Sequence, residues 1–188
     1  MSGAKSTVRM AEAVAETLRS HGVEAIVIGA IALAAHRYVR YTDDIDLGVN
    51  ADVATLRVLV EKLRGEGFGV ELREPDANDP LGGVVDVSGP AGLVQIISYA
   101  DRFPAVIEDA LAESTLVVHE GSALRIVPVA HLIALKLYAG GFKSRADIME
   151  LIRRNPELDL NAVRDLCRRY RLAEIDEWLR EVDGNSII

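Results

Sequence analysis

The sequence has few of the features that define disulfide-bonded, zinc-binding or membrane-spanning proteins. Its 188 residues contain a single cysteine, Cys167, which excludes an internal disulfide and a zinc site built on several cysteines. The four histidines have no metal-ligand spacing, so the sequence does not indicate a zinc hydrolase. The uncharged stretch at residues 25–35 is far too short for a membrane span, and no signal-peptide pattern opens the chain. We therefore predict a cytoplasmic protein that does not contact membranes.

Positive charge is also scarce. The chain has 21 Lys and Arg residues against 29 Asp and Glu, a net charge of −8. All of the excess lies in residues 1–127, which carry 11 basic and 19 acidic side chains, whereas residues 128–188 carry 10 of each. Broad binding to double-stranded DNA needs many cationic contacts to phosphates, so we expect no such partner.

The segment at residues 25–49 is the most informative part of the chain. A β-branched apolar run at residues 25–28 predicts a strand that stops at Gly29 and Ala30. The following residues, rich in alanine and leucine, predict a helix over residues 30–36. Because both turn residues are small, their backbone N–H groups are open to a phosphate.

Two carboxylates follow on what we predict to be the next strand. Alternate residues of a strand share a face, so Asp44 and Asp46 point the same way, with Arg40 and Thr42 behind them as candidates for nucleotide binding. Paired carboxylates repel unless a cation lies between them. A hard cation, Mg²⁺ or Mn²⁺, shared with the phosphates of an NTP would satisfy the pair. The alternative interpretation is a solvated turn and strand edge without a ligand.

The small-residue turn, the helix and the motif R-x-T-x-D-I-D-L resemble the nucleotidyltransferase superfamily, and most closely its AbiEii-like, toxin-type branch. The resemblance implies that Gly29 and Ala30 hold the nucleotide phosphates and that Asp44 and Asp46 bind the metals. Ala30 departs from the usual glycine or serine, which removes a hydroxyl but keeps the N–H groups.

The resemblance also implies a third carboxylate on a neighbouring strand, where this sequence has Gln95. Residues 82–88 and 93–99 are apolar runs joined by Gly-Pro-Ala-Gly, which predicts a hairpin with Asp86 directly opposite Gln95. In that register Asp86 supplies the missing catalytic and metal-binding acid. A slip of one residue would turn it to the other face, as a polar residue on a solvated hairpin.

The second block of resemblance lies in the C-terminal third. Residues 128–140 predict the most apolar helix of the chain, in which Lys136 is the only charged residue and faces either an anion or a structural ion-pair partner. The spacing from Ser144 to Asp147 predicts a capping box at the start of the next helix, which is enough to explain Asp147. The same segment resembles the second AbiEii-type signature. It implies that Lys136, Arg145 and Asp147 bind nucleotide, with Arg145 clamping the triphosphate.

We therefore predict an α/β (α+β) fold with a mixed nucleotidyltransferase-like sheet in residues 1–127, flanked by helices. Residues 128–188 form a helical part packed on this core, either as a separate unit or within one domain. Short strands are expected at residues 115–118 and 124–127.

The predicted reaction is metal-dependent transfer of a nucleoside monophosphate from an NTP to a hydroxyl. The resemblance implies a hydroxyl of tRNA or protein as the acceptor, and a component of a toxin–antitoxin system with a cognate antitoxin. The first alternative is a degenerate protein that binds a nucleotide or a partner without turnover, which Gln95 and Ala30 favour. An aspartate-nucleophile phosphatase does not fit, because the acid pair begins a strand and Gly48 follows it. An EF-hand fails because Thr55 stands where the bidentate glutamate belongs.

Overall fold

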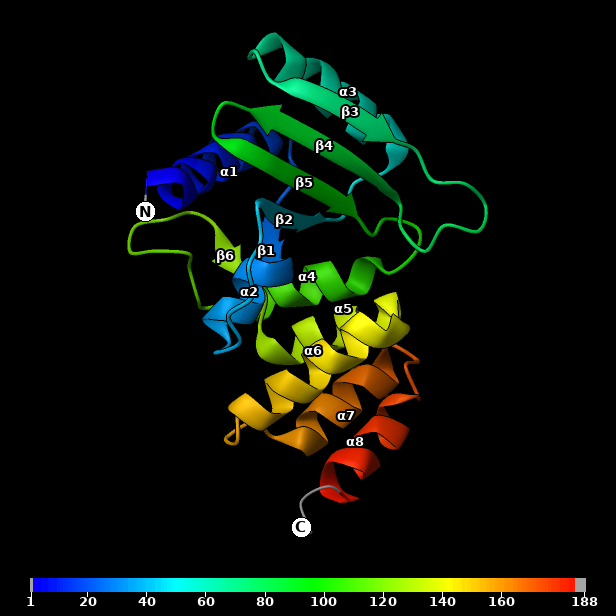
Figure 1. Ribbon diagram of the computed structural model, residues 1–188. Helices are drawn as coiled ribbons and strands as arrows, with labels where there is room; N and C mark the ends of the chain where they lie inside the picture. Colours follow the sequence, from blue (N-terminus) through cyan, green and yellow to red (C-terminus); the bar gives the residue numbers. More distant parts are fainter. Residues whose placement is uncertain (1, 185–188) are drawn as a thin grey trace.

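A computed structural model describes residues 2–184 of the chain. Within these residues the protein forms one six-stranded mixed sheet and eight helices (Figure 1). The strands, in the order in which they lie side by side, are β3 (Gly69–Arg73), β4 (Gly83–Gly89), β5 (Gly92–Ser98), β2 (Asp44–Val49), β1 (Ala25–Ile28) and β6 (Arg125–Ile126). β2 runs parallel to β5 and β1 parallel to β6, whereas the other neighbours are antiparallel. The predicted mixed sheet is confirmed.

The helices form two groups. The helices of the N-terminal part are α1 (Ser2–Ser20), α2 (Gly29–Ala35), α3 (Val53–Gly65) and α4 (Pro104–Glu113). The C-terminal group is α5 (Val129–Ala139), α6 (Gly141–Arg154), α7 (Leu160–Arg169) and α8 (Ile175–Gly184). α1 and α3 pack on the sheet, and α4 joins it to the C-terminal stack (Figure 1). No helix within residues 2–184 combines the length and apolar character needed to cross a bilayer.

One cluster of buried apolar side chains connects the sheet with the helical stack. It includes Leu47 on β2, Ile133 on α5, Ile148 on α6 and Val163 on α7. The helical part is therefore held on the sheet by the hydrophobic effect, which fixes the position of α5 and α6 relative to β2.

Local sequence signals explain several boundaries. Asp52 caps α3, because its carboxylate accepts a hydrogen bond of 2.7 Å from the backbone N–H of Thr55; the sequence offers either Asn50 or Asp52 for this position. The hairpin of β4 and β5 has the predicted register, with Asp86 opposite Gln95. Both agreements arise where a few adjacent residues determine the geometry.

Two local predictions were wrong. The expected strand at residues 115–118 reduces to an isolated bridge between Val117 and Arg125, because Leu116 and Val117 are exposed and have no core to bury against. The expected capping box is absent, since α6 begins at Gly141 and Ser144 is buried inside the helix. Gly140 and Gly141 both have positive φ, a conformation that favours glycine, and α6 begins at the second of them. Asp147 is therefore not a capping residue.

Candidate active site

The site is built on the turn between β1 and α2. Gly29 has a φ of +67°, a conformation that favours glycine, and a Cβ at this position would lie 1.7 Å from Oδ2 of Asp46. The Asp46 carboxylate therefore lies directly over the Gly29 backbone. Ala30 follows as the next residue of α2 and is buried. The turn and the second acid of the D-x-D pair are therefore in contact.

Asp44 and Asp46 lie on one face of β2, and their environments differ. The Thr42 hydroxyl donates a short hydrogen bond to the Asp44 carboxylate. Burial, together with the negative charge of Asp44, raises the pKa of the Asp46 carboxyl to about 6, while Lys136, Lys143 and Arg40 oppose the shift. The pair is thus two like charges held side by side, one of them poorly solvated.

A buried carboxylate from the helical part organises two of these cations. Asp147 is 1% exposed, and its Oδ1 accepts a hydrogen bond of 2.7 Å from Nη1 of Arg40. Its Oδ2 lies 2.8 Å from Nζ of Lys136. This second contact is an ion pair, since Oδ2 has no aligned hydrogen-bond donor among the described residues. The loop before β2, α5 and α6 therefore meet at one ion-pair cluster, Arg40–Asp147–Lys136, close enough to influence Asp46.

The third predicted acid lies further along the sheet. Across the strands, Glu71 pairs with Asp86, Asp86 with Gln95, and Gln95 with Asp46, so the four form one row on one face. Asp86 is two strands from Asp46, or about 10 Å at the usual strand spacing. Its carboxylate accepts a hydrogen bond of 2.6 Å from Nε2 of Gln95. Arg73 binds the same carboxylate at 3.1 Å.

Lys143, which the sequence analysis did not single out, lies closer to the acid pair in its electrostatic effect than the predicted Arg145. Residues 143 and 147 are one helical turn apart on α6, whereas residue 145 lies about 200° around the axis from residue 143. Accordingly Lys143 influences Asp46, and the Arg145 guanidinium lies 5.8 Å from the ring centroid of Trp178. The sequence analysis missed Lys143 because it placed the start of the helix at Ser144, which leaves Lys143 outside the helix and therefore not on the same face as Asp147. The nucleotide-binding role of Arg145 stays a prediction.

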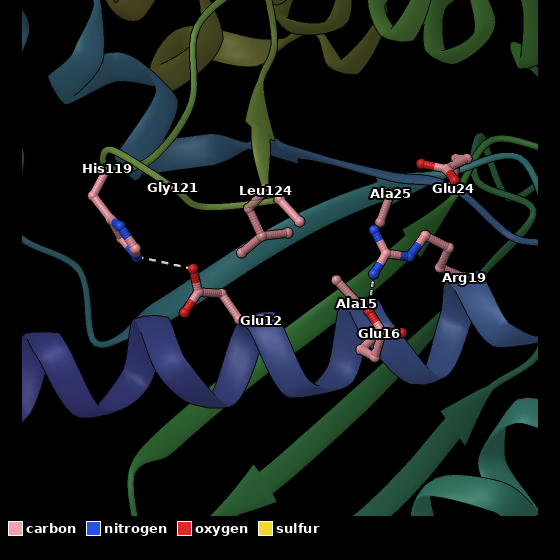
Figure 2. Close-up of a pocket in the computed structure, with 10 residues that line it drawn as sticks. Glu12, Ala15, Glu16, Arg19, Glu24, Ala25, His119, Gly121 and Leu124 are labelled. Atoms are coloured by element: carbon pink, nitrogen blue, oxygen red, sulfur yellow. Dashed lines mark hydrogen bonds and ion pairs between the residues drawn. The ribbon is translucent and has the colours of Figure 1, made fainter.

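Two hollows lie near the N-terminal helix. A cavity of about 520 Å³ adjoins Asp44 and is lined by Thr7, Val8, Ile31, Tyr41, Thr42, Asp43, Asp44, Ile45, Ala91 and Gly92. A second cavity, of about 340 Å³, lies between α1 and the segment at residues 119–124 (Figure 2). In it Glu12 lies 2.9 Å from Nε2 of His119. Of the candidate site residues, Thr42 and Asp44 line the first hollow, and none is among the residues that line the second.

The mixed sheet, the glycine turn and the acid pair on β2 together define a nucleotidyltransferase-like fold with a candidate active site at its centre. Comparison with solved structures agrees. The chain superposes on the antibiotic-resistance factor ANT(2″)-Ia in solution with a TM-score of 0.54 at 19% identity, over 96% of this chain and 100% of that one. A crystal structure of ANT(2″)-Ia in complex with adenylyl-2″-tobramycin gives a TM-score of 0.52 at 17% identity, over 87% and 96%.

The sequence comparisons were negative: neither a protein-family pattern nor a curated protein matches the chain. The structural likeness therefore defines the fold. The resemblance to the AbiEii-like branch stays a prediction.

Proposed function

We propose that the protein transfers a nucleoside monophosphate from an NTP to a hydroxyl group and releases pyrophosphate. The attacking oxygen forms a bond to the α-phosphorus, the bond from that phosphorus to the β-phosphate oxygen breaks, and the hydroxyl proton passes to solvent. The observation that carries the proposal is the contact between Asp46 and Gly29, with Asp44 beside it on β2 and three cations within electrostatic reach.

The donor set fits Mg²⁺ or Mn²⁺. Asp44 and Asp46 are adjacent carboxylates on one strand face, and burial makes their mutual repulsion costly without a cation. No group of three potential ligands occurs within residues 2–184, which suits a metal that takes one or two carboxylates and completes its shell with waters and substrate phosphates. When bound, such a metal supplies charge stabilisation for the transferring phosphoryl group.

The cations provide the binding site for the triphosphate. Arg40 and Lys136 enter it already oriented by Asp147, so neither side chain has to be ordered when the nucleotide binds. Lys143 adds a third charge from the same helix face as Asp147. The backbone N–H groups of Gly29 and Ala30 are the proposed donors to phosphate oxygens. Gly29 also lets the Asp46 carboxylate lie against its backbone, and Thr42 orients Asp44.

The proposal also gives roles to Asp86 and Arg145, which lie outside the acid pair and its three neighbouring cations. As the third acid, Asp86 would complete the metal shell or take the hydroxyl proton. Its position on the same sheet face as Asp46 supports this role. Its distance from Asp46 and its bonds to Gln95 and Arg73 weigh against this role. Arg145 would reach the triphosphate only by leaving the Trp178 ring.

The acceptor is a tRNA, a protein side chain or a small molecule. The AbiEii resemblance favours the first two, together with an antitoxin partner. The complex of ANT(2″)-Ia with adenylyl-2″-tobramycin favours the third. So does the cavity at Asp44, which is lined by Asp43 and Asp44 and, among the residues whose side chains are described, by no lysine or arginine, an unfavourable surface for a nucleic acid.

A degenerate protein that binds a nucleotide without turnover is the second candidate, favoured by Gln95 in place of an acid. The two are separated by measuring pyrophosphate release with each of the four NTPs and Mg²⁺, in separate reactions with total tRNA, total protein and tobramycin. Release that depends on one acceptor, and that is lost in Asp44→Asn, supports the enzyme. Thermal stabilisation by an NTP without release in any reaction selects the binding protein.

A further inference from the structure

Gln95 occupies the place between the acid pair and Asp86. On the row across the sheet it is the neighbour of Asp46 on one side and of Asp86 on the other. It is partly buried, and the strands on both sides hold its backbone in place. Whatever approaches the acid pair from the β4 side therefore meets the amide of Gln95.

The orientation of this amide is determined by its partner. A carboxylate only accepts hydrogen bonds, so the atom of Gln95 that lies 2.6 Å from Oδ1 of Asp86 must be the Nε2 donor. The carbonyl oxygen Oε1 is consequently directed away from Asp86. Arg73 binds Asp86 at 3.1 Å from the far side, so the Asp86 carboxylate is held between Arg73 and Gln95. The side chains thus form a chain of polar contacts across β3, β4 and β5, from Arg73 through Asp86 to Gln95, which fixes the orientation of the Gln95 amide.

The position of the cations identifies the side from which the acceptor comes. In phosphoryl transfer the attacking and leaving oxygens lie roughly in line through the phosphorus. In the proposed reaction, Gly29 and the Arg40–Asp147–Lys136 cluster hold the triphosphate, and hence the leaving pyrophosphate. Gly29 lies on the β1 side of Asp46, because Ile28, the residue before it, is the strand partner of Asp46. Gln95 borders Asp46 on the opposite side, one strand away.

We infer, resting on the proposed function, that Oε1 of Gln95 accepts a hydrogen bond from the attacking hydroxyl of the acceptor and holds it in line. A neutral amide cannot take the proton, which passes to solvent. Asp86 is then a positioning residue that acts through Gln95, and Arg73 supports it. This role differs from that of a third metal ligand, which would require Asp86 itself to reach the metal.

A double-mutant cycle distinguishes the two roles. Gln95→Leu removes the amide at similar volume, Asp86→Asn removes the carboxylate that orients it, and Glu71→Gln is the control, an exposed acid one strand beyond Asp86 in the same row. Pyrophosphate release is measured in separate reactions with total tRNA, total protein and tobramycin. The affinity for Mg²⁺ with a non-hydrolysable NTP analogue is measured on the same samples.

For the acceptor that supports wild-type turnover, Gln95→Leu and Asp86→Asn should each lower kcat/KM at least tenfold, with the analogue affinity within twofold of wild type. The double variant should be no slower than Gln95→Leu, because both changes act on one group. Glu71→Gln should match wild type. In the NMR spectrum of ¹⁵N-labelled protein, one side-chain amide proton of Gln95 should be shifted downfield, and Asp86→Asn should abolish that shift.

Unchanged kcat/KM in Gln95→Leu, or a double variant slower than both single variants, overturns the inference while leaving the proposed function intact. A loss of analogue affinity in Asp86→Asn also overturns it and assigns Asp86 to the metal. Absence of wild-type release with all three acceptors is a different result, in which the proposed function fails and the inference fails with it.

Discussion

Replacing Asp147 with asparagine should destabilise the protein strongly, although the two side chains have nearly the same shape. Asp147 is 1% exposed and is the counter-charge for both Arg40 and Lys136. Removing one partner of a buried ion pair costs about 3–5 kcal/mol. Arg40 and Lys136 remain 29% and 17% exposed, so water recovers part of this cost, and we expect a loss of about 2–3 kcal/mol.

The free energy of unfolding would be measured by urea denaturation, and the melting temperature by circular dichroism, where the expected decrease is roughly 5–10 °C. Asp165→Asn, an exposed acid on α7, is the matched control and should change the free energy by less than about 0.5 kcal/mol. Inorganic pyrophosphate should stabilise Asp147→Asn more than wild type, because the anion supplies the missing negative charge. A loss below about 1 kcal/mol, or equal stabilisation by pyrophosphate, would refute the reasoning.

Three further outcomes follow from the site and the core. Asp44→Asn and Asp46→Asn should melt no lower than wild type without metal, since the repulsion is relieved, but should lose the stabilisation by Mg²⁺ with an NTP in thermal-shift measurements. Gly29→Ala should abolish transfer and lower stability by more than about 2 kcal/mol, whereas Gly121→Ala, which also has positive φ but open space around it, should cost no more than about 1 kcal/mol in urea denaturation. Burial lowers the pKa of His131 below 6.5, so below pH 6.5 the unfolded chain binds a proton that the folded protein does not. The contribution of His131 to stability should therefore be full above pH 6.5 and fall as the pH decreases. Denaturation curves of His131→Leu, measured at several pH values, should lack this contribution.

The sequence predicts the parts of the site that neighbouring residues determine. The strand, the glycine turn and the alternation of Asp44 and Asp46 are local patterns, and the structure contains all of them. The opposition of Asp86 and Gln95 also follows from a short hairpin loop. In each case the residues involved are close in sequence, so few alternative geometries exist.

The contacts of Asp147 could not be predicted in the same way. Its partner Arg40 is 107 residues away, and only the packing of the helical part on the sheet brings them together. The capping-box spacing gave a sufficient local explanation that was wrong, because two glycines with positive φ moved the start of α6. A helix start at Gly141 would have placed Lys143 on the face of Asp147, so the signal for Lys143 was in the sequence, but it depended on that boundary.

The central claim is transfer of the nucleoside monophosphate itself, and it is tested most directly by following the α- and γ-phosphates separately. The wild-type protein is incubated with Mg²⁺ and NTP labelled at either position, in the acceptor mixture that supports turnover, with Asp46→Asn as the control. The account predicts that the α-label becomes covalently attached to the acceptor while the γ-label appears in pyrophosphate, and that Asp46→Asn does neither. Transfer of the γ-label to the acceptor, or its release as inorganic phosphate with the α-label left in a nucleoside diphosphate, would contradict it.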